Sequence, residues 1–352
     1  MTIHEPTLQF LFGRMFDELS VSYGGVMISI GHRLGLYRLL AEAGPLTCQA
    51  LAAKGDYAER YVREWLASQV AGRCVDYNPA SETYHLTPEQ AAIFANPASP
   101  TFLAPAWQCV AALWAGEERV LEAFRTGAGI AWSDQDQRMI CGSAAFYRNG
   151  YAASLVQEWL PALPGMVGRL EAGAEVADIG CGHGYSTLLM AEAFPKSRFT
   201  GIDADPGSIA VAQALTAERG LTDRVSFVLC DAKELPDKGY DLVCLFDCLH
   251  DMGFPVASAL AARRALKPGG ALLAVEPFAR DRLEDNISAV GRAFYAASTA
   301  VCCAHAISEN GTHALGAQAG FAALRAVLND AGFGSVRVAV ETPFNLVIDA
   351  RA

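Results

Sequence analysis

A run of closely spaced glycines directly after an apolar stretch limits what this chain can fold into more than any other feature. Residues 175–179 read as a buried strand and lead into Asp178-Ile-Gly180-Cys-Gly182-His-Gly184-Tyr-Ser186, after which residues 187–194 are expected to be helical. Glycine adopts backbone conformations that other residues avoid, and it lets a ligand approach the main chain closely. This order of strand, glycine turn and helix predicts a ligand site.

The spacing of these glycines disfavours a dinucleotide ligand. They occupy positions one, three and five of the turn, whereas a dinucleotide-binding turn has its third glycine, or an alanine, at position six. Position six here is the bulky Tyr185. Asp178, which precedes the glycines, would repel a pyrophosphate but suits a cationic ligand. An NAD-dependent oxidoreductase is therefore disfavoured.

The sequence after residue 170 alternates short apolar runs with helical stretches, which is typical of a parallel sheet covered by helices. A helical insert is expected over 280–319, a helix over 321–331, and a hairpin at the end of the chain. The expected strands are residues 175–179, 198–202, 225–230, 241–246, 271–275, 336–341 and 344–349. The fold class predicted for this half is α/β.

Acidic residues stand at the ends of three successive predicted strands. Asp203 follows the second strand, where a carboxylate can accept hydrogen bonds from both hydroxyls of a ribose, and Asp231 follows the third. Ligands of open α/β sheets lie at the carboxyl ends of the strands. Asp178, Asp203 and Asp231 are therefore expected to face one crevice.

The first half of the chain has helical periodicity and contains a winged-helix pattern. Helices over 47–54 and 57–71 precede two short strands, 74–77 and 82–86, joined by a loop rich in turn-forming residues. Thr87-Pro88-Glu89-Gln90 then has the pattern of a capping box. Because two prolines and a glycine interrupt 160–165, a domain boundary is expected after residue 165.

The charge of the chain disfavours nucleic acid and anionic membranes as partners. Of its 352 residues 38 are acidic and 27 are Lys or Arg, which gives a formal charge of −11. The winged-helix pattern carries slightly more acids than bases, whereas reading DNA requires a basic face. We expect it to serve packing or dimerisation. The apolar first helices, Met15 to Leu40, either face a partner subunit or belong to the chain's own core.

The ten cysteines are expected to be reduced core thiols, because no C-x-x-C pair occurs and several lie inside apolar runs. The histidines show no ligand spacing, so no metal site is expected. The first residues lack the basic stretch of a signal peptide, and no apolar run reads as a membrane span. These features predict a cytoplasmic protein.

Together these motifs resemble the class I methyltransferases that depend on S-adenosylmethionine (SAM). The strand, D-x-G-C-G-x-G turn and helix match that family, and further segments resemble its bacterial two-domain members, which have an N-terminal winged helix and act on small molecules. The further matching segments are 57–65, 84–90, Asp203, Asp231, 245–247, His250-Asp251, 265–270 and 284–286. The resemblance covers nearly the whole chain. It implies a Rossmann-like seven-stranded sheet, SAM as cofactor and S-adenosylhomocysteine (SAH) as product.

The resemblance also implies a place for each part of the cofactor. The glycine turn would pass beneath its amino acid part, Asp203 would hold the ribose, and Asp231 with Ala232 would meet the adenine. Asp178 and Asp247 would lie near the methionine end. The full set of implied cofactor-binding residues is Asp178, Gly180, Cys181, Gly182, Gly184, Asp203, Ala204, Asp231, Ala232, Phe246 and Asp247.

A histidine after the fourth predicted strand is the candidate for catalysis. Methyl transfer is an in-line displacement, and an acceptor hydroxyl or thiol must also lose its proton to a base. His250, followed by Asp251, resembles the His-Asp pair that many small-molecule O-methyltransferases place beside the transferred methyl. We expect His250 to be the general base. The alternative is that it only orders its loop or lines the SAM pocket.

The crevice needs a lid, for which residues 144–151 and 281–316 qualify. The candidate substrate residues in these segments are Tyr147, Tyr151, Asn286 and Tyr295. Aromatic faces can stabilise a sulfonium, although the tyrosines can equally be helix-packing residues. We therefore expect a dimerisation and substrate-lid domain over 1–165 and a SAM-binding catalytic domain over 166–352, in a homodimer.

Two classes of function compete. The leading one is an enzyme that methylates an oxygen, sulfur or nitrogen atom of a small molecule. The rival is a winged-helix transcriptional regulator that senses SAM without catalysis.

Overall fold

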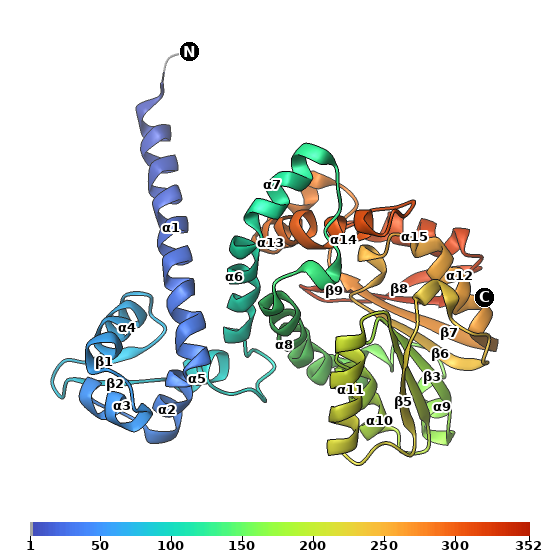
Figure 1. Ribbon diagram of the computed structural model, residues 1–352, viewed down its shortest axis with the longest axis horizontal. Helices are drawn as coiled ribbons and strands as arrows, with labels where there is room; N and C mark the ends of the chain where they lie inside the picture. Colours follow the sequence, from blue (N-terminus) through green and yellow to red (C-terminus); the bar gives the residue numbers. More distant parts are fainter. Residues whose placement is uncertain (1–2) are drawn as a thin grey trace. The chain divides into compact units, whose positions relative to one another are not determined.

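The computed structural model describes residues 3–352, which form two compact units (Figure 1). One unit contains the residues up to 112 together with 137–149. The other contains residues 113–136 and 150–352. The domain boundary expected after residue 165 stays a prediction.

The first unit is a winged helix preceded by a long helix, α1 (Glu5–Arg33). Its remaining elements are α2 (Leu36–Ala43), α3 (Cys48–Gly55), α4 (Glu59–Ala71), β1 (Asp76–Asn78), β2 (Thr83–His85) and α5 (Pro88–Phe94). The capping box at Thr87 is confirmed, since Thr87 and Gln90 each accept a hydrogen bond from the backbone N–H of the other. Trp65 ties α4 to α1, because its indole N–H donates to the carbonyl of Met27 over 2.9 Å.

The second unit is built on a seven-stranded sheet with the order β5-β4-β3-β6-β7-β9-β8. The first five strands in this order run parallel to one another, and β9 runs antiparallel to both β7 and β8. The strands are β3 (Glu175–Ile179), β4 (Arg198–Asp203), β5 (Val225–Leu229), β6 (Tyr240–Phe246), β7 (Leu266–Pro277), β8 (Ser335–Glu341) and β9 (Asn345–Arg351). The predicted α/β fold with a seven-stranded, mostly parallel sheet is confirmed.

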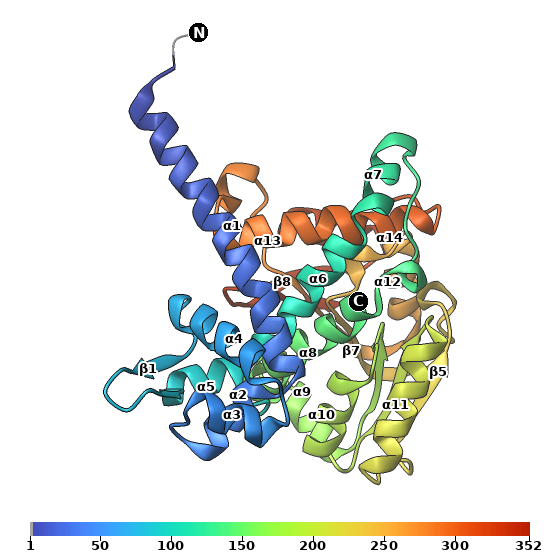
Figure 2. The ribbon, with the colours of Figure 1, turned by 60° about the vertical axis from the view of Figure 1, so that its left-hand side comes forward.

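Helices cover the sheet along its length (Figure 2). Helices α10 and α11 pack on β4 and β5, while α12 and α15 pack on each other and on β7 and β8. The helices after α5 are α6 (Trp107–Ala115), α7 (Glu117–Thr126), α8 (Gln137–Ser154), α9 (Met166–Ala172), α10 (Tyr185–Ala193), α11 (Pro206–Glu218), α12 (Pro255–Ala265), α13 (Ala289–Ala297), α14 (Cys303–Ser308) and α15 (Gly320–Asp330). Within residues 3–352, no helix has both the length and the apolar character that a bilayer span requires.

The register of the parallel strands brings their carboxyl ends to one edge. Ile179 of β3 lies opposite Ile202 of β4 and Leu245 of β6, and Phe246 lies opposite Val275 of β7. Nearly every residue of β3 and β6 is buried, and so is β7 from Gly270 on, as expected for a parallel sheet covered on both faces. The residues that follow the strands are therefore grouped at this edge.

Three details differ from the sequence expectations. Strand β7 begins at Leu266 rather than at 271, because Leu266 pairs with Tyr240 before the register shifts. Helix α10 begins at Tyr185, directly after the glycine turn. The expected insert at 280–319 is regularly helical only between 289 and 308.

Candidate active site

The glycine turn between β3 and α10 requires glycine at each of its three positions. Gly180, Gly182 and Gly184 have φ angles of 68°, 52° and 76°, in the left-handed region that side chains disfavour. A Cβ atom at Gly184 would come within 2.6 Å of the Phe227 ring, but a Cβ at Gly182 would meet no atom within 4 Å. A Cβ at Gly180 would come within 2.8 Å of Cys248, so the turn packs tightly at both ends and leaves open space at its middle.

Asp178, at the end of β3, is buried with a side-chain oxygen that has no partner. Its Oδ2 accepts hydrogen bonds of 2.6 Å from the hydroxyls of both Ser186 and Thr187. Its Oδ1 is buried and has no partner among residues 3–352. Burial raises the pKa of Asp178 to about 6, although the two hydroxyls oppose this shift. A donor from a ligand would satisfy the free oxygen.

Asp203, at the end of β4, faces the same turn. Its Oδ2 accepts from the backbone N–H of Gly182 over 2.8 Å, and its Oδ1 accepts from that of Asp205 over 2.9 Å. Burial raises its pKa. Because each carboxylate oxygen can accept more than one hydrogen bond, Asp203 can still receive two hydroxyl groups.

The end of β5 is more open. Asp231 accepts from the backbone N–H of Lys233 over 3.1 Å, and the Lys233 ammonium lies 2.7 Å from its other oxygen. Ala232 follows it at the start of a short 3-10 turn, and Ala204 follows Asp203. These residues provide the outer part of the edge.

Asp247, after β6, is held by residues from two other elements. The Tyr151 hydroxyl from α8 donates to its Oδ2 over 2.8 Å, and the Asn345 amide donates to its Oδ1 over 3.4 Å. The Tyr151 ring also lies against Phe246, with ring centroids 5.4 Å apart. Burial, together with the charge of Glu276, raises the pKa of Asp247 to about 8.

His250 is buried and paired with Glu276, a residue that the sequence analysis did not single out. The ring Nδ1 lies 2.6 Å from Oε2 of Glu276. Glu276 also accepts from two backbone N–H groups, that of Leu249 at Oε1 and that of His250 at Oε2. Although burial alone would lower the pKa of His250, the neighbouring Cys302 and Glu276 raise it well above the usual value. Glu276 lies at the end of β7, so the rule that predicted the other acids would have found it.

The helical insert is bonded to the loop that carries His250. The backbone N–H of Gly316 donates to the carbonyl of His250 over 2.9 Å, and the backbone N–H of Gly253 donates to Glu309 over 2.7 Å. Glu309 also lies 3.6 Å from the ring of His305. The insert therefore forms a wall beside His250.

The other three candidate substrate residues have different surroundings. Asn286 uses its side-chain amide entirely to close the turn at 280–286, where it donates to the carbonyls of Arg280 and Arg282 and accepts from the N–H of Arg280. We therefore leave it out of the acceptor site. Tyr295 is half-buried on α13. Tyr147 belongs to the first unit, where its ring lies edge-on to Phe146.

Asp178, Asp203, Asp247 and Glu276 together form what we call the acidic edge. Among residues 3–352, none of these four carboxyl groups forms an ion pair with a lysine or an arginine, and their one basic partner is His250. Burying carboxyl groups without cations is costly. The acidic edge therefore suits a ligand that brings positive charge.

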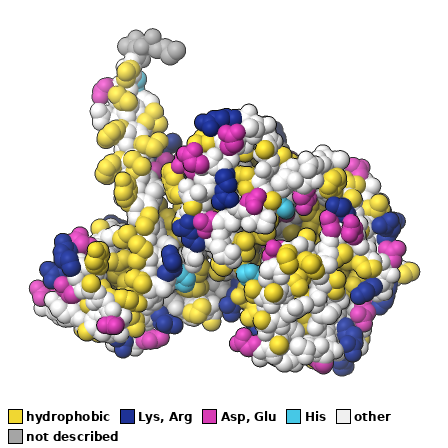
Figure 3. Space-filling model, in the orientation of Figure 1, with side chains coloured by type: hydrophobic (Ala, Val, Ile, Leu, Met, Phe, Trp, Pro, Cys, Tyr) yellow, Lys and Arg dark blue, Asp and Glu magenta, His cyan; other side chains and the backbone are white. Residues whose placement is uncertain are grey.

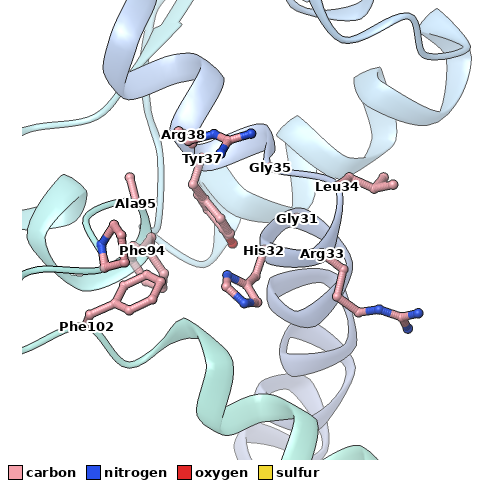
Figure 4. Close-up of a pocket in the computed structure, with 11 residues that line it drawn as sticks. Gly31, His32, Arg33, Leu34, Gly35, Tyr37, Arg38, Phe94, Ala95 and Phe102 are labelled. Carbon is pink, nitrogen blue, oxygen red and sulfur yellow. The ribbon is translucent and has the colours of Figure 1, made fainter. Parts of the chain in front are cut away.

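The first unit has a cavity of its own, of about 300 Å³, where α1 meets α2 and α5 (Figure 4). The rings of His32, Tyr37, Phe94 and Phe102 line it, and the centroids of His32 and Phe102 are 5.6 Å apart. None of the predicted site residues lines this cavity.

Each of the two units contains a segment that matches a known protein family. Residues 22–96 match the family model of the Rv2258c-like winged HTH domain, and residues 170–320 match that of a methyltransferase domain. The chain is 25% identical to the mitomycin biosynthesis 6-O-methyltransferase of Streptomyces lavendulae, over 76% of this chain and 77% of that protein. Matches to three other curated relatives span only 24%, 49% and 37% of those proteins.

Solved structures share the fold over almost the full length. The mitomycin 7-O-methyltransferase MmcR has a TM-score of 0.70 at 21% identity, with coverage of 99% of this chain and 100% of that one. Human N-acetylserotonin methyltransferase in complex with SAM has a TM-score of 0.68 at 18% identity, with coverage of 97% of both chains. At these identities the likeness is one of fold.

Proposed function

We propose that this chain, which combines a winged helix-turn-helix domain with a methyltransferase domain, transfers a methyl group from SAM to an oxygen, sulfur or nitrogen atom of a small molecule. The observation that carries the proposal is the acidic edge beside an open glycine turn. Asp178 has a buried oxygen that lacks a donor, and SAM carries both an ammonium and a sulfonium. Similar solved structures that contain SAM or SAH support this cofactor.

The predicted cofactor residues fit such a ligand. The open space over Gly182 gives the amino acid part of the cofactor room beside Asp178, and Asp203 has lone pairs for the ribose hydroxyls. Asp231 and Ala232 would meet the adenine at the outer part of the edge. Cys181, Ala204 and Phe246 would complete the lining.

The residues around His250 suit proton removal. SAM supplies an electrophilic methyl group, and holding the acceptor in line with it can lower the barrier by up to roughly 7–11 kcal/mol. Glu276 holds His250 through Nδ1 and Cys302 also hydrogen-bonds the ring, and we propose that Nε2 takes the acceptor's proton. Because its neighbours raise the pKa of His250, the ring must first lose a proton to solvent, so we expect the rate to increase with pH.

Of the three possible acceptor atoms, oxygen, sulfur and nitrogen, oxygen is favoured. The chain resembles proteins named as O-methyltransferases, and the base that we assign to His250 is needed for a hydroxyl. The insert beside His250 and the rings of Tyr151, Tyr147 and Tyr295 are the proposed acceptor contacts. Which small molecule binds there depends on these segments.

We further propose a homodimer that is formed through α1. Large apolar side chains are exposed along this helix and are visible in Figure 3; the most exposed of those in residues 8–16 are Phe10, Phe12 and Phe16, at 68%, 70% and 65%. An exposed apolar surface of this extent is typical of an interface. A cytoplasmic location is consistent with the ten free cysteines, since thiols persist in reducing compartments.

The regulator alternative is less well supported. The arginines of α4, the helix that would read DNA, are paired with glutamates on the same helix: Arg60 with Glu64 and Arg63 with Glu59. This helix therefore lacks the basic face that phosphate contacts require.

Labelled-methyl transfer tests the proposal. The full chain is incubated with methyl-labelled SAM and a panel of catechols, phenols, carboxylates, thiols and amines, and label in the product is measured. We expect label on an oxygen acceptor, with SAH formed in equal amount. Sequence-selective, salt-resistant DNA binding without label transfer would favour the regulator.

A further inference from the structure

Asp247 is held in a conformation that only its surroundings can explain. Its φ is 51°, a left-handed value that costs a non-glycine residue about 1–2 kcal/mol. Its backbone N–H donates to the carbonyl of Val275 over 2.7 Å, while Tyr151 and Asn345 each donate to one oxygen of its side chain. Three elements thus fix the position of this carboxyl group.

The charged groups that face Asp247 leave it short of positive charge. Glu276 from β7 and Asp251 from the following loop are acidic, and the charged group that opposes them within residues 3–352 is His250. His250 is already bonded to Glu276. Tyr151 and Asn345 donate hydrogen bonds but bring no charge. A cation that approaches this carboxyl group would therefore be strongly stabilised, and a neutral molecule of the same shape would not be.

We propose that Asp247 is the group by which this protein distinguishes SAM from SAH, and that SAM binding releases the proton of its carboxyl group. The inference rests on the proposed function. The two ligands differ at one atom, since SAM has a positively charged sulfonium where SAH has a neutral thioether. When SAM binds, the Asp247 carboxyl gives its proton to solvent and the carboxylate faces the sulfonium. When the sulfonium has lost its methyl group, the positive charge is gone and the carboxylate takes a proton back from solvent.

The direction of the pH dependence follows. Below about pH 8 the free protein carries the proton on Asp247, so SAM binding must displace it, and affinity for SAM rises with pH up to that point. SAH displaces no proton, so its affinity stays flat. Near pH 7.5 the neighbouring Asp178 and Asp251, whose pKa values lie at about 6, have already lost their protons. At that pH calorimetry counts protons from Asp247 and from His250, and the Asp247→Asn variant separates the two.

Calorimetry in two buffers of different ionisation enthalpy, at about pH 7.5, tests the inference because it counts released protons. For the full wild-type chain we expect a release of about 0.8 proton per SAM and close to zero per SAH. Lowering the pH by one unit should weaken SAM up to about tenfold and leave SAH unchanged. Equal proton release for both ligands would overturn the inference.

Variants separate this inference from the proposed function. Asp247→Asn should abolish the proton release and reduce the preference for SAM over SAH by about tenfold or more. Asp203→Asn, the matched control, should weaken both ligands equally and keep their ratio. An unchanged SAM-to-SAH ratio in Asp247→Asn, with both ligands still bound, would overturn the inference alone. Absence of binding by both ligands to the wild-type chain would overturn the proposed function with it.

Tyr151→Phe provides a second test that preserves the carboxyl group. Without the tyrosine hydroxyl the Asp247 carboxylate loses a donor, so its proton is held more tightly. SAM should weaken several-fold, SAH should not change, and the release of one proton should remain. Equal weakening of both ligands would contradict the role of Asp247.

Discussion

The acidic edge and α1 break the usual rule of side-chain burial in opposite directions. Of the four carboxyl groups of the acidic edge, Asp178 and Glu276 are exposed by only 1% and 0%, and Asp203 and Asp247 are half-buried. Helix α1 leaves phenylalanines such as Phe12 and Phe16 exposed to solvent. Each arrangement is costly in the isolated chain. Under the proposed function each region matches something outside the chain: the acidic edge a small cation, and α1 another apolar surface.

The largest expected effect concerns the base at the acidic edge. His250→Ala should lower turnover by about 10²–10⁴-fold and change SAM affinity by less than about threefold, because it removes proton transfer and not cofactor contacts. Steady-state kinetics and calorimetry measure the two quantities. His305→Ala is the matched control, since it removes the less buried ring of a similar pair, 3.6 Å from Glu309, and should cost far less. Equal turnover in wild type and His250→Ala would remove His250 from the mechanism.

The next effect tests whether the acidic edge binds a cation. Asp178→Asn keeps the shape of the side chain but removes its charge, so we expect SAM to bind about 100-fold more weakly, as measured by calorimetry. Ser186→Ala removes one of the hydroxyls that bind Asp178 and should have a smaller effect. If Asp178→Asn binds SAM as tightly as the wild-type chain, the charge of the acidic edge has no part in binding.

The prediction for α1 tests whether its exposed apolar side chains form the dimer interface. Phe16→Ser removes one exposed apolar side chain from each copy, so the dissociation constant of the dimer should rise about 30-fold, as measured by analytical ultracentrifugation. Val211→Ser, which alters an apolar residue on α11 that is 39% exposed, should leave it unchanged. A wild-type chain that is monomeric at micromolar concentration would mean that α1 is exposed for another reason.

The smallest expected effect concerns the glycine turn, where one glycine is needed mainly for stability and another mainly for SAM binding. Gly184→Ala places a methyl group against Phe227 and should lower the free energy of unfolding by about 3 kcal/mol. Gly182→Ala has open space around it, so it should cost only about 1–2 kcal/mol of stability but weaken SAM about tenfold. Denaturant unfolding and calorimetry distinguish the two. The reverse order of stabilities would contradict the packing described for the turn.

The sequence predicts the sheet well where the pattern is local. Strand β3 has the predicted bounds because an apolar run is enclosed between Gly173 and the glycine turn. The ends of β4 and β6 were also predicted to within one residue, since each apolar run stops at an acid. Local patterns of this kind need no knowledge of distant partners.

The sequence could not predict contacts that depend on distant residues. The sequence singled out no partner for the His250 ring, which is Glu276, beyond α12 on the neighbouring strand. Asn286 was a substrate candidate because the sequence does not reveal that the backbone of Arg280 and Arg282 takes up its amide. Helix α1 was expected to begin near Met15, yet it begins at Glu5, because its apolar residues do not mark one face.

The most direct test of the central claim is calorimetry of the full-length wild-type chain with SAM and, separately, with SAH at about pH 7.5. The acidic edge and the open glycine turn predict saturable binding of one molecule of either compound per chain, with a preference for SAM that Asp247→Asn diminishes. A titration that gives no binding heat with either compound, supported by unchanged thermal unfolding in their presence, would contradict the claim that this edge is a site for a sulfonium nucleoside.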